Sequence, residues 1–276
     1  MFEYAVLGII QGLTEWLPIS SEGIIFLTKL TFFSQDGFSF QDTFSLALFL
    51  HLGTFLAALI YFRRDVLRLT RSFFHFRQSP SADRRVIVFL VISTILSGGF
   101  GIGLLTFLSG GFSIGLLTLA VDTLLATSPK VITLIIGLLL LITGGLGLTV
   151  RSRGARPEES VSIADSVILG ILQSLSALPG ISRSGITVAG LLLRGLDDQA
   201  ALRLSFLMSL PIVLGGNIIL NLKNGLIFNF PALIGLALSF IFGLLTIHLL
   251  LRLARRISFA WFAIIFGMLS VISIFI

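Results

Sequence analysis

Six long apolar runs dominate the pattern of hydrophobic and polar positions along the chain. They cover about 44–62, 86–108, 131–150, 204–222, 231–251 and 257–276. Each run is close to the roughly 20 residues that a helix needs to cross a bilayer, so we expect six membrane-spanning helices. A weaker apolar piece, 112–126, contains Asp122 and is followed by Pro129, which favours a short helix or an outer loop over a full span.

Two further apolar stretches, about 2–30 and 163–193, are interrupted near their centres by proline, glycine and serine. These residues break helices and mark turns. We expect each stretch to form a helical hairpin with a polar tip, because backbone groups freed at membrane depth are tolerated only beside protein or a water-filled cavity.

Arginine placement predicts an orientation for the spans. Three segments, each following a span, carry most of the arginines: 63–85, 151–156 and 252–256. The positive-inside rule places all three segments in the cytoplasm. Six spans satisfy this rule if both termini lie outside, and each interrupted stretch must then return to the side from which it entered.

An internal repeat supports two matched hairpins. With an offset of 162 residues, residues 7–24 align with residues 169–186 without a gap and are identical at nine of eighteen positions, which include Gln11 with Gln173 and Ser20 with Ser182. Three spans would follow each hairpin, and because three is odd the second copy is inverted relative to the first. Inverted repeats built around broken helices place their site near the membrane midplane.

The chain is therefore predicted to be an all-α integral membrane protein with six transmembrane helices and two re-entrant helical hairpins in an inverted-topology repeat. We expect a single membrane domain over 1–276. Repeat one covers about 1–150, a basic cytoplasmic linker covers 151–162, and repeat two covers about 163–276.

Composition agrees with a membrane protein and narrows the function classes. Hydrophobic residues make up 55% of the chain and charged residues only 12%, about half of the fraction in soluble domains. The net charge of +6 comes from arginines beside apolar spans, which indicates contact with the membrane surface and no nucleic acid. The absence of cysteine excludes disulfides, thiolate metal sites and thiol catalysis.

The two predicted tips concentrate the polar side chains. Tip one offers Gln11, Thr14, Glu15, Ser20, Ser21 and Glu22, and tip two offers Gln173, Ser174, Ser176, Ser182, Arg183, Ser184 and Thr187. Ionisable residues at membrane depth mark a functional site or its internal partner. A purely structural ion pair of Glu15 or Glu22 with Arg183 is the simpler alternative. An arginine fork among hydroxyls and a helix N-terminus instead favours binding of a phosphate.

The histidines are weaker candidates. His51 lies alone inside the first span, where a core polar group is a more common role than catalysis. His75 lies in the basic cytoplasmic loop and His248 near the end of a span. The sequence contains no H-E-x-x-H motif and no P-loop.

At the two tips the sequence resembles the undecaprenyl-diphosphate phosphatase family, also called the bacitracin resistance protein family. Its first motif is similar to (E/Q)-G-x-T-E-(F/W)-L-P-(I/V)-S-S-x-G-H, which Q-G-L-T-E-W-L-P-I-S-S-E-G-I matches here up to its last position. The second motif, P-G-x-S-R-S-G-x-T, is matched fully by residues 179–187. Residues 51–67 and R-I-S-F-A-W-F-A-I near the C-terminus are also similar to the family, so the resemblance covers essentially the whole chain.

The resemblance implies a multi-pass plasma-membrane phosphatase that converts undecaprenyl (polyprenyl) diphosphate to the monophosphate and phosphate, so that a lipid carrier of cell-wall sugars can be reused. It implies a site accessible from the outer face and dependence on a divalent cation, Mg²⁺ or Ca²⁺. It leaves a homodimer open.

The resemblance also assigns roles to residues at both tips. Glu15 would be the essential carboxylate, with Gln11 as its partner, and Ser21 the nucleophile or a phosphate ligand. Arg183 would clamp the diphosphate. Beyond the resemblance, our hypothesis is that a divalent cation bridges Glu15 and Glu22 to phosphate oxygens. The further substrate-binding residues would be Ser20, Gly180, Ser182, Ser184 and Thr187.

One position departs from the family pattern. The histidine that closes the first motif is Ile24 here, and Glu22 precedes it by two residues. Three explanations follow: Glu22 takes over the proton transfer, or Glu15 activates Ser21 or a water without the histidine, or the protein has lost hydrolysis. The last explanation would leave a non-hydrolytic polyprenyl-phosphate binding or transport protein.

Overall fold

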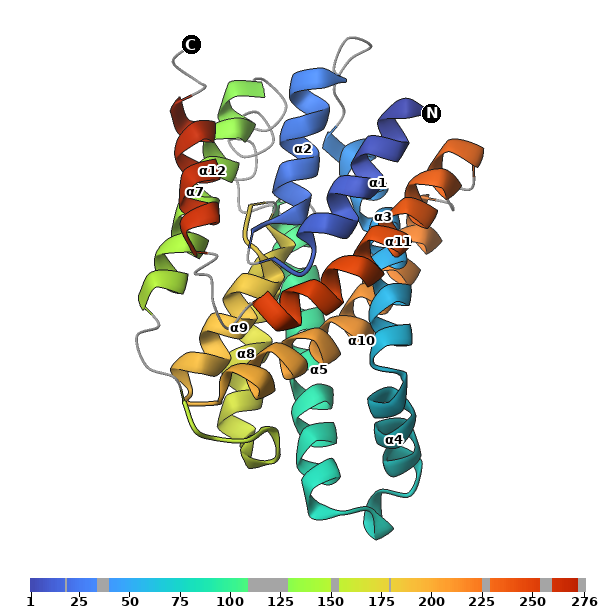
Figure 1. The fold of residues 1–276 in the computed structure, drawn as a ribbon, viewed down its shortest axis with the longest axis vertical. Coiled ribbons are helices and arrows are strands. Elements are labelled where there is room, and N and C mark those ends of the chain that lie inside the picture. Colours follow the sequence, from blue (N-terminus) through green and yellow to red (C-terminus); the bar gives the residue numbers. More distant parts are fainter. Residues whose placement is uncertain are drawn as a thin grey trace.

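The computed structural model describes residues 1–17, 19–33, 40–108, 129–149, 154–178, 180–224, 229–253 and 260–272. These residues are nearly all helical, with one isolated bridge between Arg156 and Leu196, as predicted for an all-α protein (Figure 1). The piece at 112–126 lies outside the described residues, as do most of the arginines of the 151–156 and 252–256 segments.

All six predicted spans correspond to helices of the structure. They are α3 (Phe40–Tyr61), α5 (Ser81–Leu108), α7 (Pro129–Thr149), α10 (Asp198–Asn224), α11 (Phe230–Leu253) and α12 (Ala260–Ile272). In the described part of the chain, four of them, namely α3, α5, α10 and α11, are long and apolar enough to cross a membrane.

The two interrupted stretches each form a pair of short helices, as expected. α1 (Phe2–Thr14) is followed by α2 (Ser21–Phe32), and α8 (Ile163–Ser174) is followed by the short helix η3 (Leu175–Ala177) and by α9 (Arg183–Leu193). An ion pair joins the outer ends of each pair. Lys29 Nζ lies 3.3 Å from Glu3 Oε1, and Arg194 Nε lies 2.6 Å from Asp165 Oδ1. Each stretch therefore folds back on itself.

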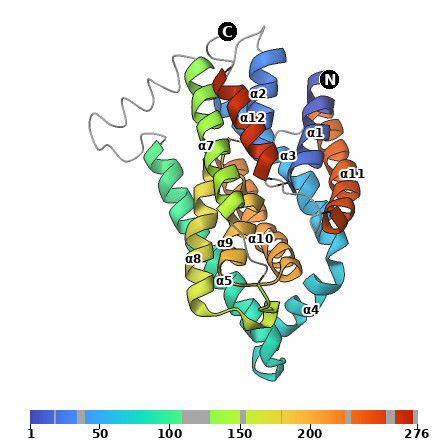
Figure 2. The same cartoon turned by 60° about the vertical axis from the view of Figure 1, so that its left-hand side comes forward.

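Each hairpin packs against a long helix from the other half of the chain. α1 lies along α11, whereas α8 lies along α5, and α7 packs on α12 (Figure 2). Glycines allow the close approach: a Cβ on Gly8 would lie 2.2 Å from Gly235 O of α11, and one on Gly170 would lie 3.0 Å from Ser93 O of α5. The first hairpin thus rests on a helix from the second half of the chain, and the second hairpin rests on a helix from the first half.

The arginine-rich segment after α3 contains a helix that was not predicted, α4 (Arg63–Phe74). Its arginines and Asp65 share the helix with Leu67, Phe73 and Phe74, whose side chains are exposed. Charged pairs tie this end of the molecule together: Arg203 of α10 pairs with Asp65, and Arg68 Nη1 lies 2.9 Å from Asp83 Oδ1 of α5. In Figure 1 the start of α1 and the end of α12 lie at the opposite end from α4.

Candidate active site

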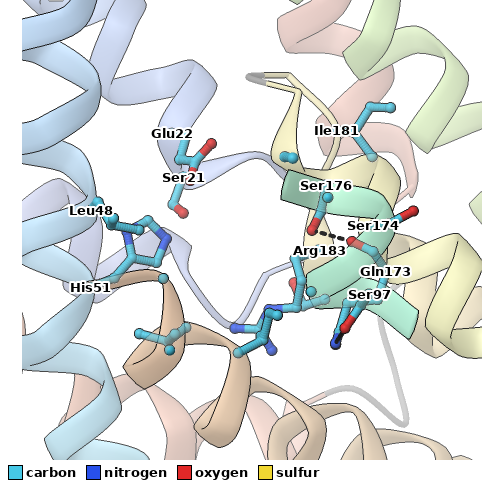
Figure 3. Close-up of a pocket in the computed structure, with 18 of the residues that line it drawn as sticks. Ser21, Glu22, Leu48, His51, Ser97, Gln173, Ser174, Ser176, Ile181 and Arg183 are labelled. Atoms are coloured by element: carbon cyan, nitrogen blue, oxygen red, sulfur yellow. Dashed lines mark hydrogen bonds between the residues drawn. The ribbon is translucent and has the colours of Figure 1, made fainter. Parts of the chain in front are cut away.

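The two tips meet at a cavity of about 290 Å³ between the hairpins and three of the long helices (Figure 3). Tip one contributes Glu15, Ser21 and Glu22, and tip two contributes Arg183. α3, α5 and α10 provide the remaining walls. The predicted meeting of the tips is thus observed, and polar groups gather at that end of the cavity.

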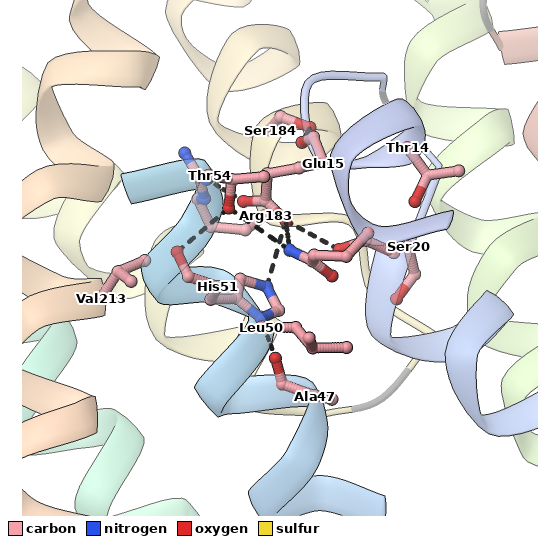
Figure 4. A network of polar contacts seen from close by, with 12 residues as sticks. Thr14, Glu15, Ser20, Ala47, Leu50, His51, Thr54, Arg183, Ser184 and Val213 are labelled. Atoms are coloured by element: carbon pink, nitrogen blue, oxygen red, sulfur yellow. Dashed lines mark hydrogen bonds and ion pairs between the residues drawn. The ribbon is translucent and has the colours of Figure 1, made fainter. Parts of the chain in front are cut away.

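Glu15 is the centre of the polar network (Figure 4). Its side chain is buried, and its Oε1 atom pairs with the guanidinium of Arg183, 168 residues away. Its Oε2 atom accepts a 2.9 Å hydrogen bond from Gln11 Nε2 and a 2.7 Å hydrogen bond from Ser21 Oγ. Charge and hydrogen bonds therefore compensate a carboxylate that would otherwise be costly to bury.

His51 of α3 completes this network, although its isolated position in the sequence favoured a core polar group. Its Nε2 lies 3.1 Å from Glu15 Oε2, and its Nδ1 lies 2.7 Å from Ala47 O. The Ala47 carbonyl can only accept, so Nδ1 carries a hydrogen. An ionised carboxylate oxygen also only accepts. A second proton, carried by Nε2 or by Oε2, must therefore lie between these two atoms. Neither tip motif contains this residue, which lies 36 positions after Glu15 and begins the 51–67 stretch that resembles the family.

Serine hydroxyls hold the tips to one another. Ser20 Oγ accepts 3.0 Å hydrogen bonds from Gly23 N at the start of α2 and from Gly180 N of the other tip. Ser184 Oγ donates a 2.8 Å hydrogen bond to Leu17 O. Gly180 has a φ of +112° and packs against α7, where a Cβ would lie 2.9 Å from Leu139, so no other residue fits there easily.

The remaining predicted site residues differ in whether they line the cavity. Ser20, Ser182 and Ser184 line the cavity, whereas Gln11, Gly180 and Thr187 are not among the described residues that line it. Thr187 Oγ1 lies 2.6 Å from Ser205 Oγ of α10 and also donates to Arg183 O at 2.7 Å. Outside the cavity, Gln11 therefore contacts the side chain of Glu15, and Thr187 contacts the backbone of Arg183.

Glu22 lines the cavity beside Ser21, in the first turn of α2. Within the described ranges it forms no ion pair, and it makes no hydrogen bond to Glu15 or Ser21. The carboxylate that faces open space is thus Glu22, whereas both oxygens of Glu15 are engaged. Ile24 does not line the cavity among these residues.

The structure offers little for a metal ion held by side chains alone. Among the residues that the structure describes, no group of three or more histidine, aspartate or glutamate side chains could hold one. Mg²⁺ is commonly bound by one or two carboxylates together with substrate phosphates and water, and Glu22 fits that arrangement.

Comparison with known proteins agrees with the motifs. The chain is 42% identical to the undecaprenyl-diphosphatase of Methanococcoides burtonii, an alignment that covers 99% of this chain and 98% of the relative. It is 37% identical to the undecaprenyl-diphosphatase of Methanothrix thermoacetophila over 96% of this chain and 93% of the relative, and 33% identical to that of Geotalea daltonii over 99% and 98%. Residues 4–272 match the bacitracin resistance protein BacA family. The chain belongs to the BacA family of multi-pass membrane proteins.

Proposed function

We propose that the protein is a membrane phosphatase that hydrolyses undecaprenyl (polyprenyl) diphosphate to the monophosphate and inorganic phosphate. Relatives of near-equal length are named for this activity. The observation that carries the proposal is the position of Glu15, which touches the hydroxyl of Ser21 and the guanidinium of Arg183 at the end of one cavity.

The proposed topology is six spans and two re-entrant hairpins, with both termini and the site's opening on the outer face. Each hairpin packs on a long helix of the other repeat, α1 on α11 and α8 on α5, and this exchange supports an inverted repeat. Each hairpin is closed by an ion pair at its outer end, as a re-entrant element requires. α4, which carries Arg63, Arg64, Arg68 and Arg71, lies at the end that the positive-inside rule assigns to the cytoplasm.

In the proposed mechanism, Ser21 Oγ attacks the terminal phosphorus and its proton passes to Glu15 Oε2, 2.7 Å away. The anhydride P–O bond breaks, its electron pair stays on the bridging oxygen, and the lipid monophosphate leaves. Water then attacks the phosphoserine, the bond between phosphorus and Ser21 Oγ breaks with its electron pair on Oγ, and both protons of the water stay on the phosphate. The proton on Glu15 returns to Ser21 as inorganic phosphate departs.

Arg183 and His51 hold the reacting groups in this mechanism. Arg183 has five N–H donors and uses two of its nitrogens on Glu15 and on Ser205 O, so donors remain for phosphate oxygens. His51, anchored through Nδ1 to Ala47, keeps the carboxylate of Glu15 oriented and holds a proton beside it. This position supports hydrolysis without the motif histidine, since His51 reaches Glu15 from another helix.

A divalent cation remains part of the proposal. Glu22 is the side chain that would hold it together with oxygens of the diphosphate, whereas Glu15 is less suited because both of its oxygens are engaged. When bound, the cation would neutralise negative charge on the substrate. Glu22→Gln should raise the Mg²⁺ concentration needed for half-maximal activity, and a direct titration of Mg²⁺ binding in the presence of a non-hydrolysable diphosphate lipid gives a second readout.

Phosphate release from polyprenyl diphosphate by the purified protein tests the proposal. The native protein should turn over repeatedly, and Ser21→Ala should lose about 10³-fold or more in kcat. Ser209→Ala is the matched control, because Ser209 is also buried, in α10, and among the described residues its hydroxyl bonds only to Phe206 O of its own helix. Acid quenching with substrate labelled in the terminal phosphate should trap label on Ser21.

The same assay separates a phosphatase from a carrier. A carrier would equilibrate labelled polyprenyl phosphate across liposomes and release no phosphate. That result would overturn the proposed function.

A further inference from the structure

The cavity continues from its polar end into a space with apolar walls. Beyond Arg183 it is lined by α5 and α10, where Thr94 and Ser97 are the polar lining residues of α5. We define the slot by six of the apolar lining residues: Gly98, Gly101 and Ile102 of α5, and Ile212, Gly215 and Gly216 of α10. Leu48 of α3 lies on the other side of the cavity, next to His51 (Figure 3). The phosphate-binding end and the slot are therefore parts of one continuous space.

The slot glycines differ from the glycines at helix contacts. A Cβ on Gly12 or Gly53 would lie within 2.7 Å or 2.6 Å of α11, so those positions must be glycine for the helices to pack. A Cβ on Gly98 would meet nothing closer than Ile212 Cδ1 at 3.8 Å, and one on Gly215 would meet no described residue within 4 Å. A glycine inside a helix costs about 0.5–1 kcal/mol relative to alanine. Helix packing does not explain that cost at Gly98 and Gly215.

The internal repeat shows where the space comes from. Phe44, Leu48, Leu52 and Gly53 of α3 align with Phe206, Leu210, Leu214 and Gly215 of α10 at the same offset of 162 residues. Gly53 is closed by α11, where a Cβ would lie 2.6 Å from Leu236 O. At the equivalent place in the other repeat, α5 leaves Gly215 uncovered among the described residues. The slot is thus the open counterpart of a closed helix contact.

The slot also reaches the surface of the protein. Ile102 is 46% exposed, and Ile219, which lines the cavity one turn beyond Gly215, is 40% exposed. Both residues lie in the last turn of a candidate span, Ser81–Leu104 or Asp198–Ile219, so this opening lies at the end of the spans that the proposed topology places on the outer face. At its inner end Gln173 is 2% exposed and lines the cavity, and within the described ranges its Oε1 has no hydrogen-bond partner. This oxygen can only accept a hydrogen bond, so a water molecule that donates to it is expected beside Gln173, at the junction of the slot with the polar end.

We propose that the slot between α5 and α10 binds the first isoprene units of the substrate's lipid tail while the diphosphate lies against Arg183. The missing side chains at Gly98 and Gly215 give a methyl-branched chain the width it needs to leave the cavity sideways into the membrane. This inference rests on the proposed function and deepens it, because it assigns recognition of the lipid tail to residues outside both motifs.

Filling the slot tests the inference. Gly98→Leu and Gly215→Leu should lower kcat/KM for a C55 diphosphate about tenfold or more, mainly through KM, and leave kcat/KM for a diphosphate without an isoprene tail, methyl diphosphate, within about twofold. Gly99→Leu is the matched control, since Gly99 is exposed on the same helix and does not line the cavity. Leucine is a better helix former than glycine, so these variants should fold.

Either of two results would overturn the slot: unchanged kinetics for both substrates, or an equal loss for both. Photocrosslinking with a polyprenyl monophosphate that carries a diazirine in its first isoprene units gives an independent readout. Crosslinks should fall on 98–102 and 212–219, and crosslinks confined to α7 or α12 would contradict the slot. If the native protein releases no phosphate from either substrate, the proposed function fails, and crosslinking still decides where the tail binds.

Discussion

The two tips begin their second helices in the same way. Ser20 Oγ accepts a 3.0 Å hydrogen bond from Gly23 N, and Ser182 Oγ accepts a 3.0 Å hydrogen bond from Gly185 N. Both serines have extended backbones and cap the helix through the amide three residues ahead. The offset of 162 residues that aligns the sequences therefore also aligns the backbone hydrogen bonds.

The side chains that face the cavity are different in the two repeats. The aligned pairs are Glu15 with Ala177, Ser21 with Arg183, Glu22 with Ser184 and His51 with Val213. The first repeat thus holds the carboxylates, the candidate nucleophile and the histidine, whereas the second holds the guanidinium of Arg183. Neither tip alone has a complete set of groups for phosphoryl transfer. The site therefore exists only where the two tips meet.

Removing the carboxylate that joins the tips should have the largest effect. Glu15→Gln takes away the proton acceptor of Ser21 and the partner of Arg183, and we expect a loss of about 10³-fold in phosphate release. Glu22→Gln is the matched control, because Glu22 lines the same cavity without bonding to Ser21, and should lose far less at saturating Mg²⁺. Equal losses in the two variants would remove the distinction between the carboxylates.

The second tip is tested through its guanidinium. Arg183→Lys keeps the charge and loses the planar fork, so phosphate release should fall about 10²-fold. Arg203→Lys is the control, since Arg203 also pairs with a carboxylate, that of Asp65, but lies in the charged network near α4, away from the cavity. Near-normal activity of Arg183→Lys would show that a point charge suffices and that the fork is not used.

A substitution that makes the first repeat resemble the second should have a smaller effect. His51→Val installs the residue found at the aligned position 213 and should reduce kcat about tenfold or more, with a changed dependence of kcat on pH. His51→Gln, which keeps a hydrogen-bond donor for Glu15, should recover part of the activity. A pH profile of His51→Val identical to that of the native protein would assign His51 a structural role only.

The smallest expected effect concerns stability. Ser20→Ala removes the cap of α2 and the acceptor for Gly180 N, whereas Ser182→Ala removes the cap of α9 and weaker contacts. The loss of a cap costs about 1 kcal/mol, so we expect thermal unfolding in detergent to shift by a few degrees, and further for Ser20→Ala than for Ser182→Ala. The reverse order would show that the bond between the tips contributes little.

Much of the fold could be predicted because it rests on local pattern. Apolar length predicts the spans, and proline, glycine and serine predict the breaks in 2–30 and 163–193. A pairing of Arg183 with a glutamate of the first tip also follows from sequence, since an isolated charge at membrane depth requires a partner, but the sequence left Glu15 and Glu22 as alternatives. α4 was missed because its arginines were interpreted only as an orientation signal, although Leu67, Phe73 and Phe74 give it an apolar side.

The remainder of the site depends on contacts between distant helices. His51 reaches Glu15 only because α3 packs beside the first tip, and no short motif contains both residues. Extending the repeat alignment to α3 and α10 would have shown His51 opposite Val213 and so marked it as specific to one repeat. The slot could not be predicted at all, because Gly53 and Gly215 are the same residue in the same repeat position and differ only in what packs on them.

The central claim is that the two tips form one site, and a double-mutant cycle on phosphate release tests it most directly. If Glu15 and Arg183 act as a unit, Glu15→Gln combined with Arg183→Lys should lose about as much activity as Glu15→Gln alone, roughly 10³-fold. Losses that multiply to roughly 10⁵-fold would mean that the two residues act independently, and would contradict a single site built from both tips.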